Sequence, residues 1–376
     1  MSRERREKGS RPRALGAERI SRRDFLGKAT GVAATLAAGG GIGGILAACG
    51  GGPTVVSKKK TYTIAIVPKG LDNPVFALAN LGGQVRAKEL GNVHFVFTAS
   101  STTDTNGDIN VIQGLIEQKV DAIGVSCNDP NAYVPVLNHA VDSGIKVMTW
   151  DSDAPSSKRI CFYGVDSTAV GKRMGQEISR LLNGQGNIVI ISGDPAALNL
   201  NQRIQGVRSA LPSGIKVLQV LYTNDDIPSA IQKTEDAIRT YPDLNGIVMV
   251  GGWALFSNEG ATPLLDQKKG QIKVVSFDPL KSVVDYLRDG IVQSVWTQDY
   301  WGWGYQSVTI LYSLLQGNRW HEFIPQPSNN VTPDQWQVWQ QRWAAVDQGA
   351  AAAARVWGEK PFTAPGPSNA TGPLRG

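Results

Sequence analysis

The sequence contains one pattern twice, as GIKVMTWD at residues 144–151 and as GQIKVVSFD at residues 270–278. Each stretch begins at a glycine, continues as an apolar run of strand length and ends at an aspartate. A further apolar run precedes each of them, at Asp121–Ser126 and at Gly246–Val250, separated from it by a loop and a helix-length segment. The repetition predicts two similar halves made of alternating strands and helices.

Short Val- and Ile-rich runs alternate with amphipathic segments along most of the chain, which is typical of parallel sheets with helices on both faces. The expected strands are Tyr62–Val67, Phe95–Thr98, Ala122–Val125, Lys146–Trp150, Cys161–Val165, Ile188–Ser192, Lys216–Leu221, Gly246–Val250, Lys273–Phe277 and Val292–Trp296. The expected helices are Ala77–Leu90, Val134–Asp142, Ala169–Leu182, Arg203–Leu211, Ile227–Thr240, Ser282–Arg288 and Thr332–Val346. The sequence therefore predicts an α/β fold, and its length suits two domains.

The positive net charge of the chain belongs to its N-terminal part. Residues 1–48 hold ten basic and four acidic residues, whereas residues 49–376 hold 28 of each sign. A nucleic-acid-binding protein carries its basic excess on the folded domain, where it neutralises phosphates. We therefore expect no nucleic-acid partner.

The N-terminal part has the features of an export signal. Residues 21–28 read SRRDFLGK, which resembles the twin-arginine signal with Arg22 and Arg23 as the recognised pair. The following apolar stretch, residues 29–48, carries no charge but contains six glycines, which favours a cleaved signal over a permanent anchor. The sequence LAAC at 46–49 resembles the bacterial lipobox, in which the cysteine is acylated. This implies a signal peptide over residues 1–48, a lipid anchor on Cys49 and a tether over residues 49–60, and hence a location in the periplasm or on the cell surface.

Cysteine and histidine content excludes two classes of small-domain architecture. Cys127 and Cys161 are too few for a disulfide scaffold, and the sequence leaves open whether they pair or stay free. The three histidines are isolated, so no zinc-ligand spacing is present. We expect no metal and no cofactor, although an all-carboxylate metal site stays open.

Polar and aromatic residues follow the ends of most of the expected strands. They lie at Pro68–Phe76, Ser126–Pro130, Asp151–Asp153, Gly193–Asp194, Asn199–Arg203, Gly251–Trp253, Asp278–Pro279 and Thr297–Trp301. Because the carboxyl ends of parallel strands form the ligand-binding edge of a sheet, we expect these residues to share one site. Carboxylates and carboxamides bind hydroxyl groups, basic side chains donate to ring oxygens and aromatic rings cover C–H faces, so the set suits a small neutral sugar or polyol.

These motifs, in this order, resemble the periplasmic sugar-binding proteins of ABC importers, of the ribose/galactose-binding type, over roughly residues 61–324. The motif NPVF at 73–76 matches the family's Asn-Pro-aromatic loop, and NQRIQG at 201–206 matches its helix-start motif. Asp151, Asp278 and Gln298 match the polar residues after the fourth, ninth and last strands. Lys69 and the sequence TWDSD at 149–153 look closer to the rhamnose and autoinducer-2 receptors, whereas GGW at 251–253 departs from the family's Asn-Asp.

The resemblance implies a type I periplasmic binding protein, in which two Rossmann-like lobes are joined by a three-segment hinge. We expect crossings near Asp166, Gln298 and Ile324. The N-terminal lobe is then 61–166 plus 299–324, the C-terminal lobe is 167–298 plus 325–346, and 347–376 is a flexible tail. The implied ligand-binding residues are Lys69, Asn73, Phe76, Asn128, Asp151, Asp153, Asn201, Arg203, Trp253, Asp278 and Gln298.

The implied function is that of a monomeric binding protein that delivers a sugar to an ABC permease. Two alternatives stay open: a receptor for an autoinducer-2-like furanose that feeds a sensor, and an exported glycosidase with Asp151 and Asp278 as its carboxylate pair. The glycosidase alternative is disfavoured because the sequence lacks a nucleophile elbow, a metal cluster and a cofactor loop. Structural roles are alternatives for single residues: Asp153 could cap a turn, and Arg203 could form a salt bridge at a helix start.

Overall fold

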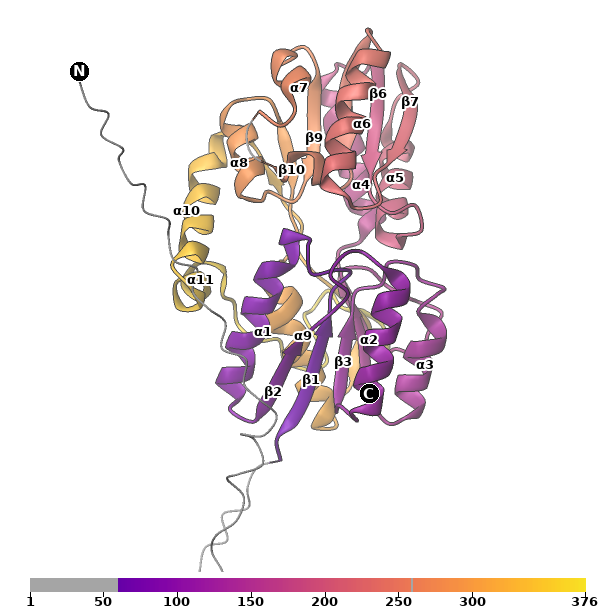
Figure 1. Ribbon diagram of the computed structural model, residues 1–376, viewed down its shortest axis with the longest axis vertical. Helices are drawn as coiled ribbons and strands as arrows, with labels where there is room; N and C mark the ends of the chain where they lie inside the picture. Colours follow the sequence, from indigo (N-terminus) through magenta and orange to yellow (C-terminus); the bar gives the residue numbers. More distant parts are fainter. Residues whose placement is uncertain (1–59, 258–259) are drawn as a thin grey trace, which may run out of the picture. The chain divides into compact units, whose positions relative to one another are not determined.

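The strands form two separate sheets, which a computed structural model describes over residues 60–257 and 260–376 (Figure 1). The first sheet has the order β13-β11-β5-β4-β3-β1-β2, and the second has the order β12-β10-β9-β8-β6-β7. The strands of the first sheet are β1 (Tyr62–Val67), β2 (Val93–Phe97), β3 (Ala122–Val125), β4 (Lys146–Trp150), β5 (Phe162–Gly164), β11 (Trp320–Pro325) and β13 (Thr371–Arg375). Those of the second are β6 (Gly186–Ser192), β7 (Ile215–Tyr222), β8 (Leu244–Met249), β9 (Lys273–Phe277), β10 (Ser294–Trp296) and β12 (Asn330–Val331). Neighbouring strands are parallel except for the edge pairs β11–β13 and β10–β12.

Each sheet carries its own helices, and we call a sheet with its helices a lobe. The helices of the first lobe are α1 (Ala77–Leu90), α2 (Thr105–Glu117), α3 (Val134–Asp142) and α9 (Gly302–Leu315). Those of the second lobe are α4 (Ser167–Leu181), α5 (Leu198–Ala210), α6 (Ile227–Thr240), α7 (Pro263–Gln267) and α8 (Lys281–Arg288). Side-chain caps set several helix starts, since Asp104, Asp166 and Asp226 accept hydrogen bonds from first-turn amides of α2, α4 and α6.

The first sheet is buried on both faces, as a parallel sheet requires. Ile64 and Ile66 of β1 pack in the core that contains residues of α1 and α9. Ala65 and Val67 point to the opposite face, into the core formed with α2 and α3. Figure 1 shows the two helix pairs on either side of the strands. Because successive side chains of β1 point into the two cores in turn, the strand is apolar at these positions, and its sequence predicts a strand that is buried on both faces.

The chain passes between the two lobes three times before helix α10. It leaves the first sheet after β5, returns between β10 and α9, and leaves again between β11 and β12. Helix α10 (Trp336–Asp347) then packs against α8 of the second lobe. Both lobes belong to one compact unit of the chain.

The segment 347–376, which we expected to be a flexible tail, is instead folded and makes a fourth crossing. Helix α11 (Ala350–Trp357) contacts α1 of the first lobe, and β13 pairs antiparallel with β11. Helix α11 begins with five consecutive alanines, Ala350–Ala354, and this run favours a helix rather than a linker because alanine has the highest helix propensity. Trp357 then anchors that helix, with its ring centroid 5.2 Å from that of Trp343 and 5.7 Å from that of Trp339.

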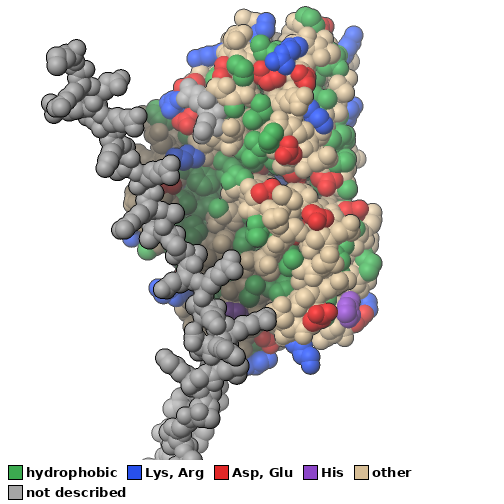
Figure 2. All heavy atoms as spheres, viewed as in Figure 1, with side chains coloured by type: hydrophobic (Ala, Val, Ile, Leu, Met, Phe, Trp, Pro, Cys, Tyr) green, Lys and Arg blue, Asp and Glu red, His purple; other side chains and the backbone are tan. Residues whose placement is uncertain are grey.

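Charges of both signs are interspersed on the surface that the structure describes. On the face seen in Figure 2, Lys and Arg side chains lie among Asp and Glu side chains rather than in one basic patch. Among residues 60–257 and 260–376, no helix is both long and apolar enough to cross a membrane. The predicted signal peptide and anchor, with Arg22, Arg23 and Cys49, lie outside the described residues.

Candidate functional site

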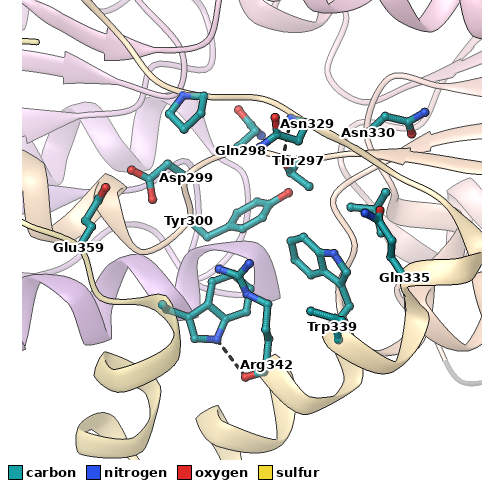
Figure 3. A pocket seen from close by; sticks show the side chains of 14 residues that line it. Thr297, Gln298, Asp299, Tyr300, Asn329, Asn330, Gln335, Trp339, Arg342 and Glu359 are labelled. Carbon is teal, nitrogen blue, oxygen red and sulfur yellow. Dashed lines mark hydrogen bonds between the residues drawn. The ribbon is translucent and has the colours of Figure 1, made fainter.

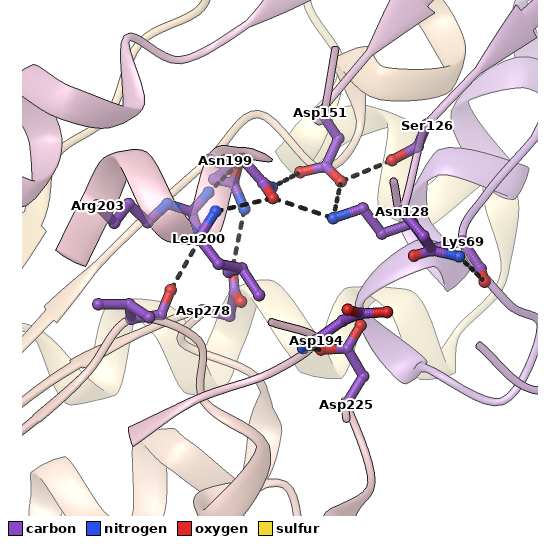
Figure 4. A network of polar contacts seen from close by, with 12 residues as sticks. Lys69, Ser126, Asn128, Asp151, Asp194, Asn199, Leu200, Arg203, Asp225 and Asp278 are labelled. Atoms are coloured by element: carbon purple, nitrogen blue, oxygen red, sulfur yellow. Dashed lines mark hydrogen bonds and ion pairs between the residues drawn. The ribbon is translucent and has the colours of Figure 1, made fainter. Parts of the chain in front are cut away.

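Polar side chains from both lobes meet between the carboxyl ends of the two sheets, and Figure 4 shows most of them. We call the space between them the cleft. Its lining residues are Lys69, Asn73, Val75, Phe76, Asp151, Asn199, Leu200, Arg203, Asp225, Trp253, Asp278, Gln298 and Trp303. Most of the residues that the sequence singled out as ligand-binding are therefore brought together, whereas Asn128, Asp153 and Asn201 are not part of the lining.

Asp151, at the end of β4, is the polar centre of the first lobe's side of the cleft. Its Oδ2 accepts a hydrogen bond from Ser126 Oγ at 2.7 Å and lies 3.7 Å from Lys69 Nζ. Asn199 of α5 reaches across from the second lobe, donating from Nδ2 to Asp151 Oδ1 at 3.3 Å and accepting from Lys69 Nζ at 3.1 Å. These four side chains are almost completely buried, so each polar contact forms with little competition from water.

Asp278, at the end of β9, is the corresponding centre in the second lobe. Its Oδ1 accepts hydrogen bonds from Tyr300 OH at 2.9 Å and from Gln298 Nε2 at 3.2 Å. Arg203 donates to Gln298 Oε1 at 3.1 Å and to the Val250 carbonyl at 2.9 Å. Burial raises the pKa of the Asp278 carboxyl to about 6, against the opposing effect of the Arg203 charge. The same burial lowers the pKa of Arg203.

The two strand-ending aspartates share an unusual backbone conformation. Asp151 has a φ of 60° and Asp278 a φ of 62°, which places both in the left-handed region. Asp is among the few residues that tolerate this region, because its short polar side chain finds local partners. The turn ends each strand abruptly and aims each carboxylate into the cleft. The pattern repeated in the sequence is thus also a repeated piece of geometry.

Close helix packing fixes the position of Arg203. In α4, a Cβ added at Gly171 would lie 2.2 Å from the carbonyl oxygen of Arg203, so α4 and α5 touch through their backbones. The Arg203 guanidinium carbon also lies 3.8 Å from the ring centroid of Phe277. Packing and stacking therefore hold the cation in one place, which lowers the entropy lost when it binds a ligand.

Aromatic residues form the remaining walls. Asn73 accepts a hydrogen bond from the Val75 amide at 3.1 Å and so starts the turn that carries Phe76. The rings of Phe76 and Trp303 lie 5.6 Å apart. Within the described part of the chain, the indole N–H groups of Trp253 and Trp303 and Nε of Arg203 are buried without a hydrogen-bond partner. Unpaired buried donors are costly, and these three belong to residues that line the cleft, although Trp150 and Trp320, outside the lining, have unpaired indole N–H groups as well.

Two predicted ligand residues have structural roles instead, and we correct them here. Asp153 forms a buried ion pair with Arg159, at 2.6 Å to both Nε and Nη2, and also accepts from Thr149 Oγ1. Asn201 donates to the Pro195 carbonyl at 2.8 Å on the outside of α5. These contacts keep the Asp153 carboxylate and the Asn201 carboxamide out of the cleft.

Asn128 is buried just behind the cleft. Its Nδ2 lies 3.3 Å from the backbone oxygen of Lys69 and donates to it. This contact holds the loop from which the Lys69 side chain enters the cleft. Asn128 is therefore a positioning residue, where we had expected a direct contact with the ligand.

The ligand-binding residues implied by the sequence leave out five residues that line the cleft, namely Asn199, Asp225, Leu200, Val75 and Trp303. Asn199 and Arg203 are four residues apart, so they share one face of α5, whereas the residue between them at 201 points elsewhere. Asp225 follows β7, a long strand after which we had expected no ligand-binding residue. Burial raises the pKa of Asp225 to about 6, and the charge of Lys69 opposes that rise. Both residues were detectable from helical spacing and strand ends.

The other residue types with potential chemistry form no further centre. Among the described residues, no group of three or more His, Cys, Asp and Glu side chains is arranged to hold a metal ion. Cys127 and Cys161 are both free and buried. Burial raises the pKa of both thiols, which makes them poor nucleophiles at neutral pH.

Comparison with known proteins agrees with this geometry. Residues 64–319 match the periplasmic binding protein domain family. This chain belongs to that family. It is similar to the D-ribose/D-allose-binding protein of Pseudomonas aeruginosa, with 26% identity over 239 residues that cover 61% of this chain and 74% of that protein. It is also similar to the xylose/arabinose-binding protein of Sulfolobus acidocaldarius, with 24% identity over 277 residues that cover 69% of this chain and 68% of the relative.

A solved structure shows the same arrangement of lobes. It is an ABC transporter solute-binding protein of Burkholderia graminis in complex with D-arabinose, with 30% identity, a TM-score of 0.68, and coverage of 73% of this chain and 96% of that one. The predicted type I fold with two α/β lobes is confirmed. The family consists of binding proteins, so this chain is a binding protein rather than an enzyme, and membership implies a location outside the cytoplasm.

Proposed function

We propose that this protein captures a monosaccharide in the cleft and delivers it to an ABC import permease. The observation that carries the proposal is the pairing of Asp151 and Asp278, which come from opposite lobes and belong to one buried polar cluster. Relatives that are named for ribose, allose, xylose and arabinose support a pentose or hexose as the ligand. The presence of Lys69 in the cleft fits the predicted likeness to rhamnose receptors, so L-rhamnose is a further candidate.

The cleft offers the groups that a sugar needs on all sides. Ionised carboxylates accept hydroxyl protons, and the unpaired N–H groups of Arg203, Trp253 and Trp303 donate to hydroxyl and ring oxygens. The ring faces of Phe76 and Trp303 suit the apolar C–H surface of the ligand. A ligand that touches both lobes favours their closed arrangement over an open one, and a permease can recognise that difference.

The test is a panel of D-ribose, D-allose, D-xylose, L-arabinose, D-arabinose, D-galactose and L-rhamnose. A tight ligand raises the melting temperature of the protein, by an amount equivalent to about 2.7 kcal/mol at one hundred times its Kd. We expect at least one sugar to do so and to be recovered unchanged. If no member of the panel shifts the melting temperature at millimolar concentration, the monosaccharide proposal fails.

We further propose that the protein is exported through its twin-arginine signal and anchored in a membrane by acylated Cys49. The motifs SRRDFLGK and LAAC support this, and the relatives are binding proteins of the same extracytoplasmic family. Replacement of both Arg22 and Arg23 by Lys should leave the precursor in the cytoplasm. The variant Cys49→Ala should partition into the aqueous fraction in detergent phase separation, and an unchanged membrane fraction would refute the anchor.

A further inference from the structure

A second hollow, separate from the interior of the cleft, lies beside the segments that cross between the lobes (Figure 3). It is open to solvent and has a volume of about 460 Å³. Its lining residues are Thr297, Gln298, Asp299, Tyr300, Pro327, Asn329, Asn330, Val331, Gln335, Val338, Trp339, Arg342, Trp357 and Glu359. Its walls therefore come from three of the four crossings and from helices α10 and α11. We call this space the hinge hollow.

Arg342 of α10 is the unsatisfied group of the hinge hollow. Its guanidinium carbon lies 4.3 Å from the ring centroid of Trp357 and 5.0 Å from that of Trp339. No described residue accepts a hydrogen bond or forms an ion pair with the guanidinium, and Nε is buried without a partner. Burial lowers the pKa of Arg342, as expected for a cation that is only partly compensated. Two indole rings thus hold a flat, charged donor group toward the space.

The acidic groups of the hinge hollow are already occupied by one another. Asp299 accepts hydrogen bonds from Tyr163 OH and from the Gly302 amide. A Cβ added at Gly302 would lie 1.8 Å from Asp299 Oδ2 and 2.7 Å from Glu359 Oε1, so the two carboxyl groups crowd one point. In Figure 3, both lie on the far side of Tyr300 from Trp339. They leave the Arg342 guanidinium as the charged group without a direct partner.

Carboxamides complete the hinge hollow. Asn330 and Gln335 each use their side-chain oxygen within the chain, accepting from Ser294 Oγ at 2.6 Å and from the Thr332 amide at 3.2 Å. Their amide N–H groups therefore stay available as donors within the described part of the chain. Together with Asn329, they line the hollow on the same side as Trp339. This arrangement offers one site for an oxyanion and several for hydroxyl groups beside an aromatic wall.

We propose that the hinge hollow is a second ligand site, which takes a small hydroxylated carboxylate of the sugar-acid class. The Arg342 guanidinium binds the carboxylate through two parallel N–H···O bonds, the carboxamides bind hydroxyl groups, and Trp339 covers a C–H face. A phosphate, or a carboxylate without hydroxyl groups such as acetate, can make only the contact with the Arg342 guanidinium. A neutral sugar can make only the contacts with the carboxamides and with the Trp339 ring.

The test is calorimetric titration of the whole protein with D-galacturonate, D-galactose, acetate and inorganic phosphate. We expect D-galacturonate to bind more tightly than acetate and phosphate, with a component that the variant Arg342→Gln weakens by at least about tenfold, since charge-assisted bidentate bonds are lost. Arg342→Lys keeps the charge without the flat fork and should weaken binding by nearly as much. The matched control is Arg355→Gln, which removes an exposed arginine from neighbouring α11 and should change nothing.

Two outcomes overturn the proposal. One is D-galacturonate binding with the same affinity and stoichiometry in wild type, Arg342→Gln and Arg342→Lys, which would place it in the cleft alone. The other is equal binding of acetate or phosphate, which would leave no role for the carboxamides. Circular dichroism of both Arg342 variants separates a lost site from a lost fold. If Arg342→Gln is unfolded, Arg342→Lys alone decides.

The hinge hollow and the cleft are connected through two side chains. Tyr300 lines the hollow with its ring while its hydroxyl donates to Asp278, and Gln298 lines both spaces. A ligand in the hollow should therefore change the affinity of the cleft for its sugar, and by reciprocity the sugar should change D-galacturonate affinity by the same factor. This part rests on the proposed function, whereas the titration above does not. Equal D-galacturonate affinity with and without saturating sugar would refute the coupling.

Discussion

Asp151 and Asp278 have equivalent places in the two lobes, yet their surroundings differ. Asp151 is close to a cation, with Lys69 Nζ at 3.7 Å, and accepts from a serine hydroxyl. Asp278 accepts from a phenol and a carboxamide, and its nearest cation, Arg203, is engaged with Gln298 and a carbonyl. Two carboxylates with different partners can recognise different hydroxyl groups of one ligand.

Removal of the Asp151 charge should weaken sugar binding without abolishing the fold. A hydrogen bond to a charged group contributes about 1.5–3 kcal/mol, so we expect Asp151→Asn to raise the Kd for the best sugar by roughly ten- to a hundredfold. The matched control is Asp153→Asn, two residues away, which breaks the buried pair with Arg159. That control should lower the melting temperature while it leaves affinity unchanged. Calorimetry and thermal melts of both variants distinguish the two roles, and equal affinities would place the sugar elsewhere.

The pH dependence of sugar binding should come from Asp278. Burial raises its pKa to about 6, so the carboxylate form that accepts two hydroxyl protons is lost as pH falls below 6. We expect affinity to decline from pH 7 to pH 5, approaching about tenfold per pH unit below the pKa. Asp278→Asn should bind weakly at all of these pH values. Asp225 also has a pKa of about 6, so Asp225→Asn is the necessary comparison, and it should keep the decline.

At the scale of single residues, the sequence indicated the site because strand ends in an α/β fold converge. The sequence-based prediction was wrong where the direction of the backbone beyond a strand end decides whether a side chain reaches the cleft. Asp153 lies only two residues beyond Asp151, but the left-handed turn at Asp151 sends the next residues away from the cleft. Asn201 was chosen by likeness to a motif, although helical spacing pairs Arg203 with Asn199 instead. Both errors concern side-chain direction, which depends on backbone angles that the residue types do not specify.

At the scale of elements, the regular parallel strands were predictable and the C-terminal additions were not. Strands such as β1, β3, β4 and β9 have the expected bounds, because continuous apolar runs of that length fit only a buried strand. Strand β11 was missed because its sequence, WHEFIP, contains His, Glu and Pro among its apolar residues. Strand β13, with a sequence rich in Gly and Pro, forms only because β11 offers an edge. Tertiary pairing decides such segments.

Helix α11 should depend on one tryptophan. The Trp357 ring packs against Trp339 and Trp343, and its Nε1 donates to the Arg342 carbonyl at 2.9 Å. Replacement of a buried tryptophan by alanine costs about 3–5 kcal/mol, and we expect the lower part of that range for Trp357→Ala because the hinge hollow lies beside it. Urea unfolding measures the change. The neighbouring variant Val356→Ala, at a side chain that is 43% exposed, should change the free energy of unfolding by less than about 0.5 kcal/mol.

At the scale of the whole molecule, one polar contact ties three of the four crossings together. Tyr163 lies within β5 of the first lobe, just before the first crossing, Asp299 lies in the second crossing and Glu359 follows α11 in the last. The Tyr163 hydroxyl donates to Asp299, and Glu359 crowds the same carboxylate. Two carboxyl groups in such contact repel each other when both are ionised, which favours the protonated form of Glu359. The protonation state of this pair should therefore influence the stability of the segments that join the lobes.

Glu359 should make the protein less stable as pH rises toward 8. Desolvation of its carboxyl group and the neighbouring Asp299 raise its pKa to about 8, compared with an ordinary value of 4.5, although the residue as a whole is exposed. Between these two values the folded protein keeps a proton that the unfolded chain has lost. Folding therefore takes up a proton, and the free energy of unfolding falls with rising pH across that window, levelling off above about pH 8.

The variant Glu359→Gln tests this, because its amide cannot ionise yet can still donate a hydrogen bond to Asp299. Its melting temperature should fall less than that of the wild type between pH 6 and pH 8.5, although Asp225 and Asp278, with pKa values of about 6, titrate in both proteins. Glu117→Gln, at an exposed position of α2, should keep the full wild-type decline. Parallel melting curves for wild type and Glu359→Gln would mean that the folded protein holds no proton on Glu359. In that case the contact is held by the Tyr163 and Gly302 donors alone, and Glu359 is ionised and solvated throughout.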